Sequence, residues 1–206
     1  MKNFLAFDAS GEELVVGVGT KTAYTERRLT ASGTENLLVE IDKCLKKSRL
    51  TINDVDSLVV GIGPGSWTGS RVAVVTAFGL ISGNPKLNLS VFNSFDLISY
   101  NVQDKEKTLK LVKAYANFVY IKTPEGEIKA IKKDELNSTY KDFKLVGFDK
   151  VTDNTEVVPL DLQKVALDKM MKKDYVNPEL VEPMYLRLSQ AEYQRLDKLK
   201  EKNDGN

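Results

Sequence analysis

The stretch of residues 59–83, VVGIGPGSWTGSRVAVVTAFGLISG, constrains the fold of this 206-residue chain more than any other segment. Its apolar beginning predicts a buried strand, and the glycines and proline that follow predict a tight turn. A helix is then predicted from about Gly69 to Ile81. Ser66 or Thr68 is expected to cap the start of this helix, and Gly83 is expected to stop it.

The predicted helix has almost no polar face. A helix that is apolar all round must be covered on both sides, by its own sheet on one side and by a second helix or a second chain on the other. Gly69, Ala73 and Ala77 recur every four residues and predict a row of small side chains that allows another helix to approach closely. The alternative is that the helix is fully buried in the core of one domain.

The glycine-rich turn is a candidate anion site, because the free N–H groups and the dipole of a helix N-terminus attract negative charge. It is not a Walker P-loop, since no lysine follows Gly69, and it is not a dinucleotide fingerprint, since the third glycine would fall at Ser66. The residues predicted to contact a nucleotide or another anion are Asp8, Ser10, Gly63, Gly65, Ser66, Thr68 and Gly69. The alternative is that the glycines only form a tight turn.

The chain contains no histidine and one cysteine. This composition excludes Ser-His-Asp and Cys-His catalytic arrangements and any zinc site built on histidine, so we expect no catalytic and no metal residues. Cys44 lies at a helical apolar position and is expected in the core. The net charge of +1 gives no general attraction to nucleic acid or membranes. The start of the chain has no leading apolar segment, which predicts a cytoplasmic protein.

The order of predicted elements indicates a ribonuclease H-like α/β lobe. Strands are expected at residues 3–9, 14–19, 23–29, 56–62 and 89–92. A helix follows the predicted capping box of Ser32 and Glu35, and the apolar helix lies between the last two strands. Three antiparallel strands followed by alternating helix and strand is the order that ribonuclease H-like proteins share with actin-like ATPases.

The composition changes after residue 100, which predicts a second lobe. We expect a first lobe at residues 1–100, a smaller lobe at 101–190 and a charged tail at 191–206. In the second lobe strands are expected at 109–115, 118–123, 128–131 and 145–148. A helix is expected after Asp161, which can cap it.

Three motifs resemble those of the TsaB (YeaZ) family and occur in the family's order along the chain. Residues 63–71, GPGSWTGSR, resemble its G-P-G-S-F-T-G-x-R signature. Residues 5–10, LAFDAS, resemble its opening L-A-I-D-T-S, and residues 183–187, PMYLR, resemble its closing P-x-Y-L-R. The resemblance spans nearly the whole chain. Residues 113–120, KAYANFVY, depart from the family pattern D-A-R-x-x-E-V-Y, so the second lobe is expected to be divergent.

The resemblance implies an actin-like (ASKHA) fold of two lobes and a function in making threonylcarbamoyladenosine in tRNA. It implies a non-catalytic scaffold or activator that pairs with a TsaD-like catalytic subunit and with a TsaE-like ATPase, and that meets tRNA only through this complex. We expect no cofactor bound by this chain alone, and a nucleotide could bind at the partner interface. Several apolar side chains exposed together would drive association, so we expect a homodimer when the partner is absent. The residues expected at the partner interface are Leu38, Ile41, Trp67, Arg71, Val72, Val75, Phe78 and Gly79.

Two alternative functions use Asp8 at the end of the first strand. An actin-like ATPase or kinase would need a second phosphate loop, but Phe148 and Asp149 lack the glycine run expected there. A two-metal nuclease would need several converging carboxylates, and the end of the fourth strand offers Gly-Pro-Gly instead. Trp67 is expected either to face a partner or to cover the end of the sheet, and Arg71 either to contact a partner or phosphate or to form a surface ion pair.

Overall fold

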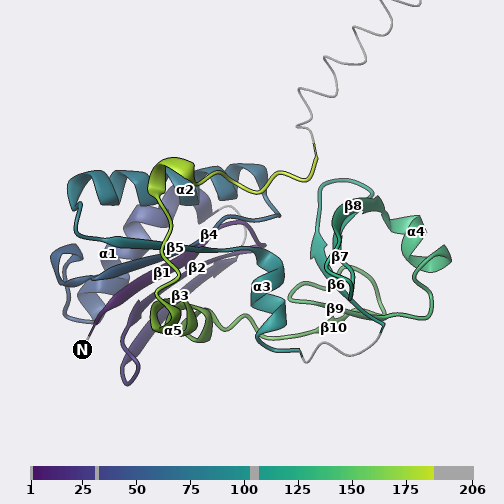
Figure 1. Cartoon of the computed structure of the whole chain (residues 1–206), viewed down its shortest axis with the longest axis horizontal. Coiled ribbons are helices and arrows are strands. Elements are labelled where there is room, and N and C mark those ends of the chain that lie inside the picture. Colours follow the sequence, from purple (N-terminus) through teal and green to yellow (C-terminus); the bar gives the residue numbers. More distant parts are fainter. Residues whose placement is uncertain (1, 31–32, 103–106, 188–206) are drawn as a thin grey trace, which may run out of the picture.

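Two five-stranded sheets lie side by side and form the two lobes of the protein (Figure 1). The structure is a computed structural model that describes residues 2–30, 33–102 and 107–187. The predicted capping box at Ser32 and the charged tail lie outside these residues.

The first sheet has the strand order β3-β2-β1-β4-β5. Its strands are β1 (Phe4–Asp8), β2 (Glu13–Gly19), β3 (Tyr24–Thr30), β4 (Ser57–Gly61) and β5 (Asn88–Phe92). β1, β2 and β3 pair antiparallel, and β1, β4 and β5 pair parallel. Both faces of β1 and β4 are buried, as expected for apolar strands that need cover on both sides. The predicted ribonuclease H-like order is confirmed.

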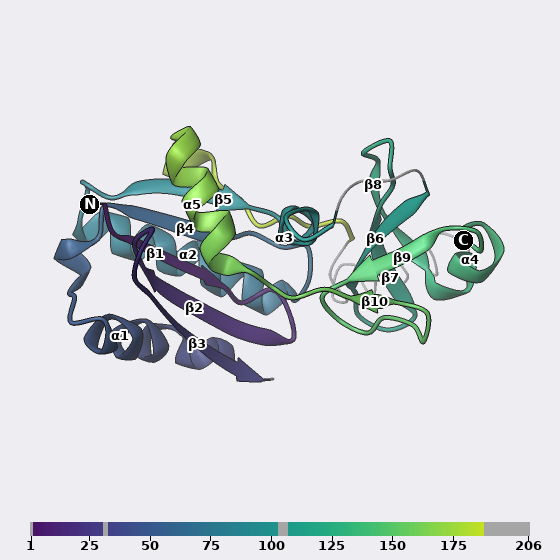
Figure 2. The ribbon, with the colours of Figure 1, turned by 90° about the horizontal axis from the view of Figure 1, so that it is seen from below.

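Helices cover both faces of the first sheet (Figures 1 and 2). α1 (Leu37–Lys47) and α2 (Trp67–Gly83) lie on one face, and α5 (Leu162–Lys172) lies on the other. The sequence predicts the α5 helix within residues 101–190, but it packs against the first sheet, because its buried Leu162, Val165 and Ala166 meet apolar side chains of β1, β2 and β4.

The boundaries of the helices follow local capping. Ser66, one of the two predicted caps, accepts a hydrogen bond from the Gly69 N–H at the start of α2. The predicted stop at Gly83 is wrong by one residue, since the helix includes Gly83 and Asn84 is its C-cap. A 3-10 turn at Gly33–Asn36 precedes α1, and another at Ile52–Asp54 precedes β4.

The second sheet repeats the topology of the first. β6 (Thr108–Lys113), β7 (Phe118–Lys122) and β8 (Ile128–Lys132) pair antiparallel, and β9 (Lys144–Gly147) and β10 (Glu156–Val157) add parallel strands beside β6, in the order β10-β9-β6-β7-β8. α4 (Lys133–Ser138) takes the place that α1 has in the first lobe. The sequence did not predict the helix α4 and the strand β10, because both are too short to show a periodic pattern of apolar residues.

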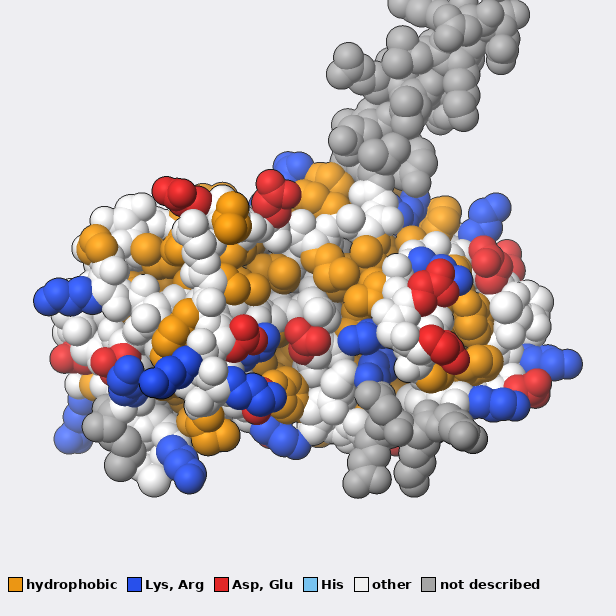
Figure 3. Space-filling model, viewed as in Figure 1, with side chains coloured by type: hydrophobic (Ala, Val, Ile, Leu, Met, Phe, Trp, Pro, Cys, Tyr) orange, Lys and Arg blue, Asp and Glu red, His pale blue; other side chains and the backbone are white. Residues whose placement is uncertain are grey.

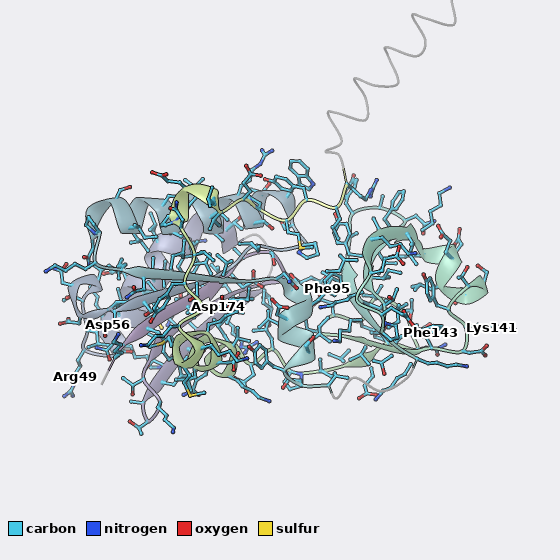
Figure 4. All side chains as sticks on the ribbon, in the orientation of Figure 1. Arg49, Asp56, Phe95, Lys141, Phe143 and Asp174 are labelled. Atoms are coloured by element: carbon cyan, nitrogen blue, oxygen red, sulfur yellow. The ribbon has the colours of Figure 1, made fainter. Side chains whose placement is uncertain are left out.

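A helix that the sequence analysis missed joins the two lobes. α3 (Ser94–Ser99) starts with a capping box of Asn93 and Asp96, a pattern that could have revealed it. Its buried Phe95, labelled in Figure 4, packs with Val112 and Tyr120 of the second sheet. α3 therefore contributes to the apolar packing of both lobes, since its Leu97 is buried with side chains of the first sheet.

Acidic and basic side chains are interspersed over one face of the molecule, in keeping with the net charge of +1 (Figure 3). In the described ranges, no helix has both the length and the apolar character needed to cross a membrane.

Candidate functional site

The glycine-rich turn packs tightly against the ends of β1 and β5. The Ser66 N–H donates to the Ser10 carbonyl at 2.7 Å, and the Ser94 N–H donates to the Gly63 carbonyl at 2.8 Å. A side chain at Gly65 would place its Cβ 2.1 Å from the Ser10 carbonyl oxygen, so only glycine allows this approach. The alternative that the glycines form a tight turn therefore has a direct structural basis.

The predicted anion contacts come together in this turn, but several of their donors are already used. The N–H of Ser66 is bonded to Ser10, and the N–H of Gly69 is bonded to the Ser66 hydroxyl at 3.1 Å. Gly63 is buried, whereas Ser66 and Thr68 are exposed. The turn keeps fewer free N–H groups for an anion than the sequence pattern suggests.

Asp8 is enclosed beneath this turn. Its Oδ1 accepts the Ser10 N–H at 2.9 Å, and its Oδ2 has no hydrogen-bond partner among the described residues. Burial raises the pKa of the Asp8 carboxyl above its ordinary value, although the hydrogen bonds from Ser10 oppose the rise. No group of three or more His, Cys, Asp or Glu in the described part of the chain could hold a metal ion. The carboxylates that a two-metal nuclease needs do not converge here.

The small-residue row of α2 faces the chain's own sheet. Ala73 and Ala77 are buried in the core beneath α2, and a Cβ at Gly69 would come within 1.7 Å of the Ala9 carbonyl oxygen. The row therefore permits α2 to approach β1 closely, and the prediction that it receives another helix is wrong.

The outer side of α2 and the start of α1 form an exposed apolar face, which we call the α1–α2 face. It contains Leu38 and Val39 of α1, 60% and 48% exposed, and Val75 of α2, 66% exposed. Gly79 lies one turn after Val75, and a Cβ there would meet nothing within 4 Å. An exposed glycine in a helix costs stability, and no neighbour among the described residues requires it.

The other predicted interface residues divide between the α1–α2 face and the core. Val72 and Phe78 are half-buried along α2. Ile41 is buried in the core beneath α1, at 3% exposure, so the structure removes it from the predicted surface. The reason is its place on the helix, since Leu37, Ile41 and Cys44 form the stripe that faces the sheet.

Trp67 stacks on Tyr185, a residue from the far end of the chain. The two ring centroids are 3.9 Å apart and the ring planes differ by 11°. Arg71 donates from Nε to the Tyr185 hydroxyl at 2.9 Å, and its guanidinium carbon lies 4.7 Å from the Trp67 ring centroid. In the described residues, Arg71 has no carboxylate within ion-pair distance. Trp67 thus leans on a neighbouring segment of its own chain, and Arg71 is not engaged in the predicted surface ion pair.

That neighbouring segment, residues 174–187, runs from α5 across the edge of β5 and past α2 to the second lobe (Figure 1). The Val176 N–H donates to the Leu89 carbonyl at 2.8 Å, and the Met184 N–H donates to the Ile62 carbonyl at 2.7 Å. At its end, the Arg187 guanidinium lies 3.5 Å from the Phe118 ring centroid of β7. We call residues 174–187 the strap, because this segment contacts β5 and α2 of the first lobe and β7 of the second lobe. The closing motif therefore packs on the central motif.

Comparisons with known proteins agree with this architecture. The family model described as TsaD, tRNA N6-adenosine threonylcarbamoyltransferase, matches residues 30–173. The Haemophilus influenzae tRNA threonylcarbamoyladenosine biosynthesis protein TsaB is 34% identical over 121 residues, which are 56% of this chain and 51% of that relative. The match thus spans about half the length of the curated relative.

Solved structures share the two-lobed fold. YeaZ from Pseudomonas aeruginosa has a TM-score of 0.71 and 19% identity, over 90% of this chain and 100% of that chain. A second Pseudomonas aeruginosa structure, described as an uncharacterized protein with similarity to peptidase YEAZ, has the same TM-score and identity over 91% of this chain and 100% of that chain. With the duplicated sheets, these likenesses identify the actin-like (ASKHA) fold predicted from the sequence.

Proposed function

Because the chain belongs to the TsaD family, and within it to the TsaB/YeaZ proteins, we propose that it takes part in threonylcarbamoyladenosine biosynthesis as a non-catalytic scaffold. In this proposal the α1–α2 face docks on a TsaD-like catalytic subunit. The partner subunit supplies the chemistry, and this chain activates it by association.

The exposed apolar side chains of the α1–α2 face are the observation that carries the proposal. Fully burying one side chain of this kind contributes roughly 1.5–3 kcal/mol. Leu38, Val39 and Val75 are all about half exposed or more, so covering them together would drive association. Gly79 supports a closely approaching partner, because the missing side chain leaves the helix backbone open there.

The chemistry of the remaining residues supports a role without catalysis. Burial raises the pKa of the Cys44 thiol to about 11, so this cysteine is a poor nucleophile at neutral pH. Asp8 is 1% exposed and cannot reach a substrate outside the fold. These environments favour the scaffold over the ATPase, kinase and nuclease alternatives.

The wider assembly follows from the same proposal. A TsaE-like ATPase joins the pair, tRNA is met only through the complex, and any nucleotide binds at the partner interface. Without the catalytic subunit, the α1–α2 face would pair with a second copy of this chain, because the same apolar side chains would otherwise stay exposed. This chain works in the cytoplasm with its partners.

Substituting Val75 tests the docking face. We expect Val75→Glu to abolish association with the TsaD-like subunit, measured by titration calorimetry of the purified proteins, since it places a charge at the most exposed apolar side chain of the face. Met171→Glu is the matched control: Met171 is 71% exposed, also on a helix, but α5 lies on the opposite side of the first sheet. The control variant should bind as wild type does.

Circular dichroism separates lost docking from lost folding. A folded Val75→Glu chain that still binds the TsaD-like subunit normally would contradict the proposal. An unfolded Val75→Glu chain would instead show that Val75 belongs to the core of the chain.

A further inference from the structure

A cavity of about 660 Å³ lies between the two lobes, lined by none of the residues of the α1–α2 face. The turn after β1 and the end of β3 form one side of it, and the segments that follow β9 and β10 form the other. This volume is within the range of about 300–1,000 Å³ that is typical of small-molecule sites. The cavity therefore has room for an organic ligand.

One wall of the cavity is apolar. Phe148 follows β9, and residues 157–160, Val-Val-Pro-Leu, continue the wall from the last residue of β10 onward. Such a wall favours a ligand with an apolar body, because covering it removes apolar surface from water.

The positive charge at the cavity is already neutralised. Arg28 donates from Nε to Glu26 at 2.6 Å, from Nη1 to Glu13 at 3.2 Å and from Nη2 to the Leu160 carbonyl at 2.7 Å. Lys113 is paired with Glu12. These cations satisfy carboxylates of the chain itself, so neither is available to attract a phosphate.

Asp149 is the carboxylate that remains without a partner. It lines the cavity, is half-buried and has no hydrogen bond or ion pair within the described ranges. The pKa of Asp149 is raised to about 6, mainly by burial and in part by the nearby charges of Glu12, Glu13 and Asp8, while Lys113 opposes the rise. At neutral pH the cavity therefore holds the negative charge of Asp149, which no described side chain pairs directly and which Lys113 attracts only from beyond ion-pair distance.

We propose that this cavity binds a small organic monocation, an ammonium or guanidinium group on an apolar body, with Asp149 as its counter-ion. The apolar wall covers the body of the ligand, and the carboxylate pairs with its charge. An anionic ligand would meet Asp149, Glu12 and Glu13 without a free cation. A divalent metal ion is a poor fit, because the described residues contain no group of three or more ligands placed to hold one.

Three probes of one shape test the charge preference. Phenethylamine, phenethyl alcohol and phenylacetate carry a positive, a neutral and a negative group on the same ring, and each is titrated into the full-length protein at neutral pH by calorimetry. We expect phenethylamine to bind about tenfold more tightly than the alcohol, because its charge pairs with the half-buried Asp149 carboxylate. We expect phenylacetate not to bind. Equal affinities for the three probes, or no saturable binding of the amine, would overturn the proposal.

Two variants test the counter-ion. Asp149→Asn should reduce the affinity for phenethylamine to that of the alcohol, whereas Asp153→Asn should leave it unchanged, because the Asp153 side chain is fully exposed and lies outside the cavity lining. Unchanged binding by the Asp149→Asn variant would refute the assignment. As a measurement that needs no variant, the affinity of the wild-type protein for the amine should fall as the pH drops below about 6, where Asp149 becomes neutral.

Discussion

Two glycines of α2 should respond in opposite ways to the same substitution. At Gly79 a Cβ meets nothing within 4 Å, so Gly79→Ala adds only helix propensity, worth about 1 kcal/mol. At Gly69 a Cβ would lie 1.7 Å from the Ala9 carbonyl oxygen, which is backbone and cannot rotate away. Gly69→Ala must therefore push α2 off the end of β1, and we expect a loss of about 3 kcal/mol or more, at the upper end for overpacked cores.

Thermal unfolding followed by circular dichroism measures both effects. In a chain of this size about 1 kcal/mol shifts Tm by roughly 2–4 °C, so Gly79→Ala should raise Tm by that amount and Gly69→Ala should lower it by roughly 6 °C or more. Each variant is the control for the other, because residue type and helix are the same. The protein is kept dilute enough to be monomeric, so that association does not contribute to Tm.

Either variant can refute this reasoning. A Gly69→Ala chain as stable as wild type would mean that α2 does not rest on Ala9. A Gly79→Ala chain with a lowered Tm would mean that the outer side of α2 is covered even in the isolated monomer, and the proposed docking face would then lose its main support.

Two further predictions concern Asp149 and the strap. Because burial raises the pKa of Asp149 from 3.8 to about 6, the folded state holds its proton more tightly than the unfolded state, so wild-type stability falls as the pH rises through this window. The full shift corresponds to about 3 kcal/mol of unfolding free energy, which solvent screening of this half-exposed group reduces to about 1–2 kcal/mol. Urea unfolding should therefore show the Asp149→Asn variant more stable than wild type by that amount at neutral pH, and equally stable near pH 4. Equal stability of the two proteins at both pH values would count against the raised pKa. Tyr185→Ala should uncover Trp67, the only tryptophan, and shift its fluorescence to the red, while Tyr185→Phe keeps the stacked ring and should leave the spectrum unchanged. An unshifted spectrum in Tyr185→Ala would show that the strap does not cover Trp67.

The sequence by itself determined the elements whose signals are local. The apolar run at residues 58–60, the capping Ser66 and the long apolar helix each depend on neighbours a few residues away, so their prediction needed no tertiary information. The order of the first sheet followed from connection lengths, since short links make antiparallel neighbours and helices join parallel strands.

The tertiary structure decided what depends on residues far apart in the chain. Whether a small-residue row faces a sheet or a partner is set by how the helix is rotated, so Ala73 and Ala77 were expected on the wrong side. The stack of Trp67 on Tyr185 joins residues far apart in the sequence that share no local pattern. The packing of α5 on the first sheet requires the chain to come back from the second lobe to the first, and the apolar periodicity of the helix does not show which sheet it will cover. The unpaired state and the raised pKa of Asp149 likewise could not be predicted from the sequence. They depend on which cations the fold places beside Glu12 and Glu13, and on how far the cavity walls exclude water.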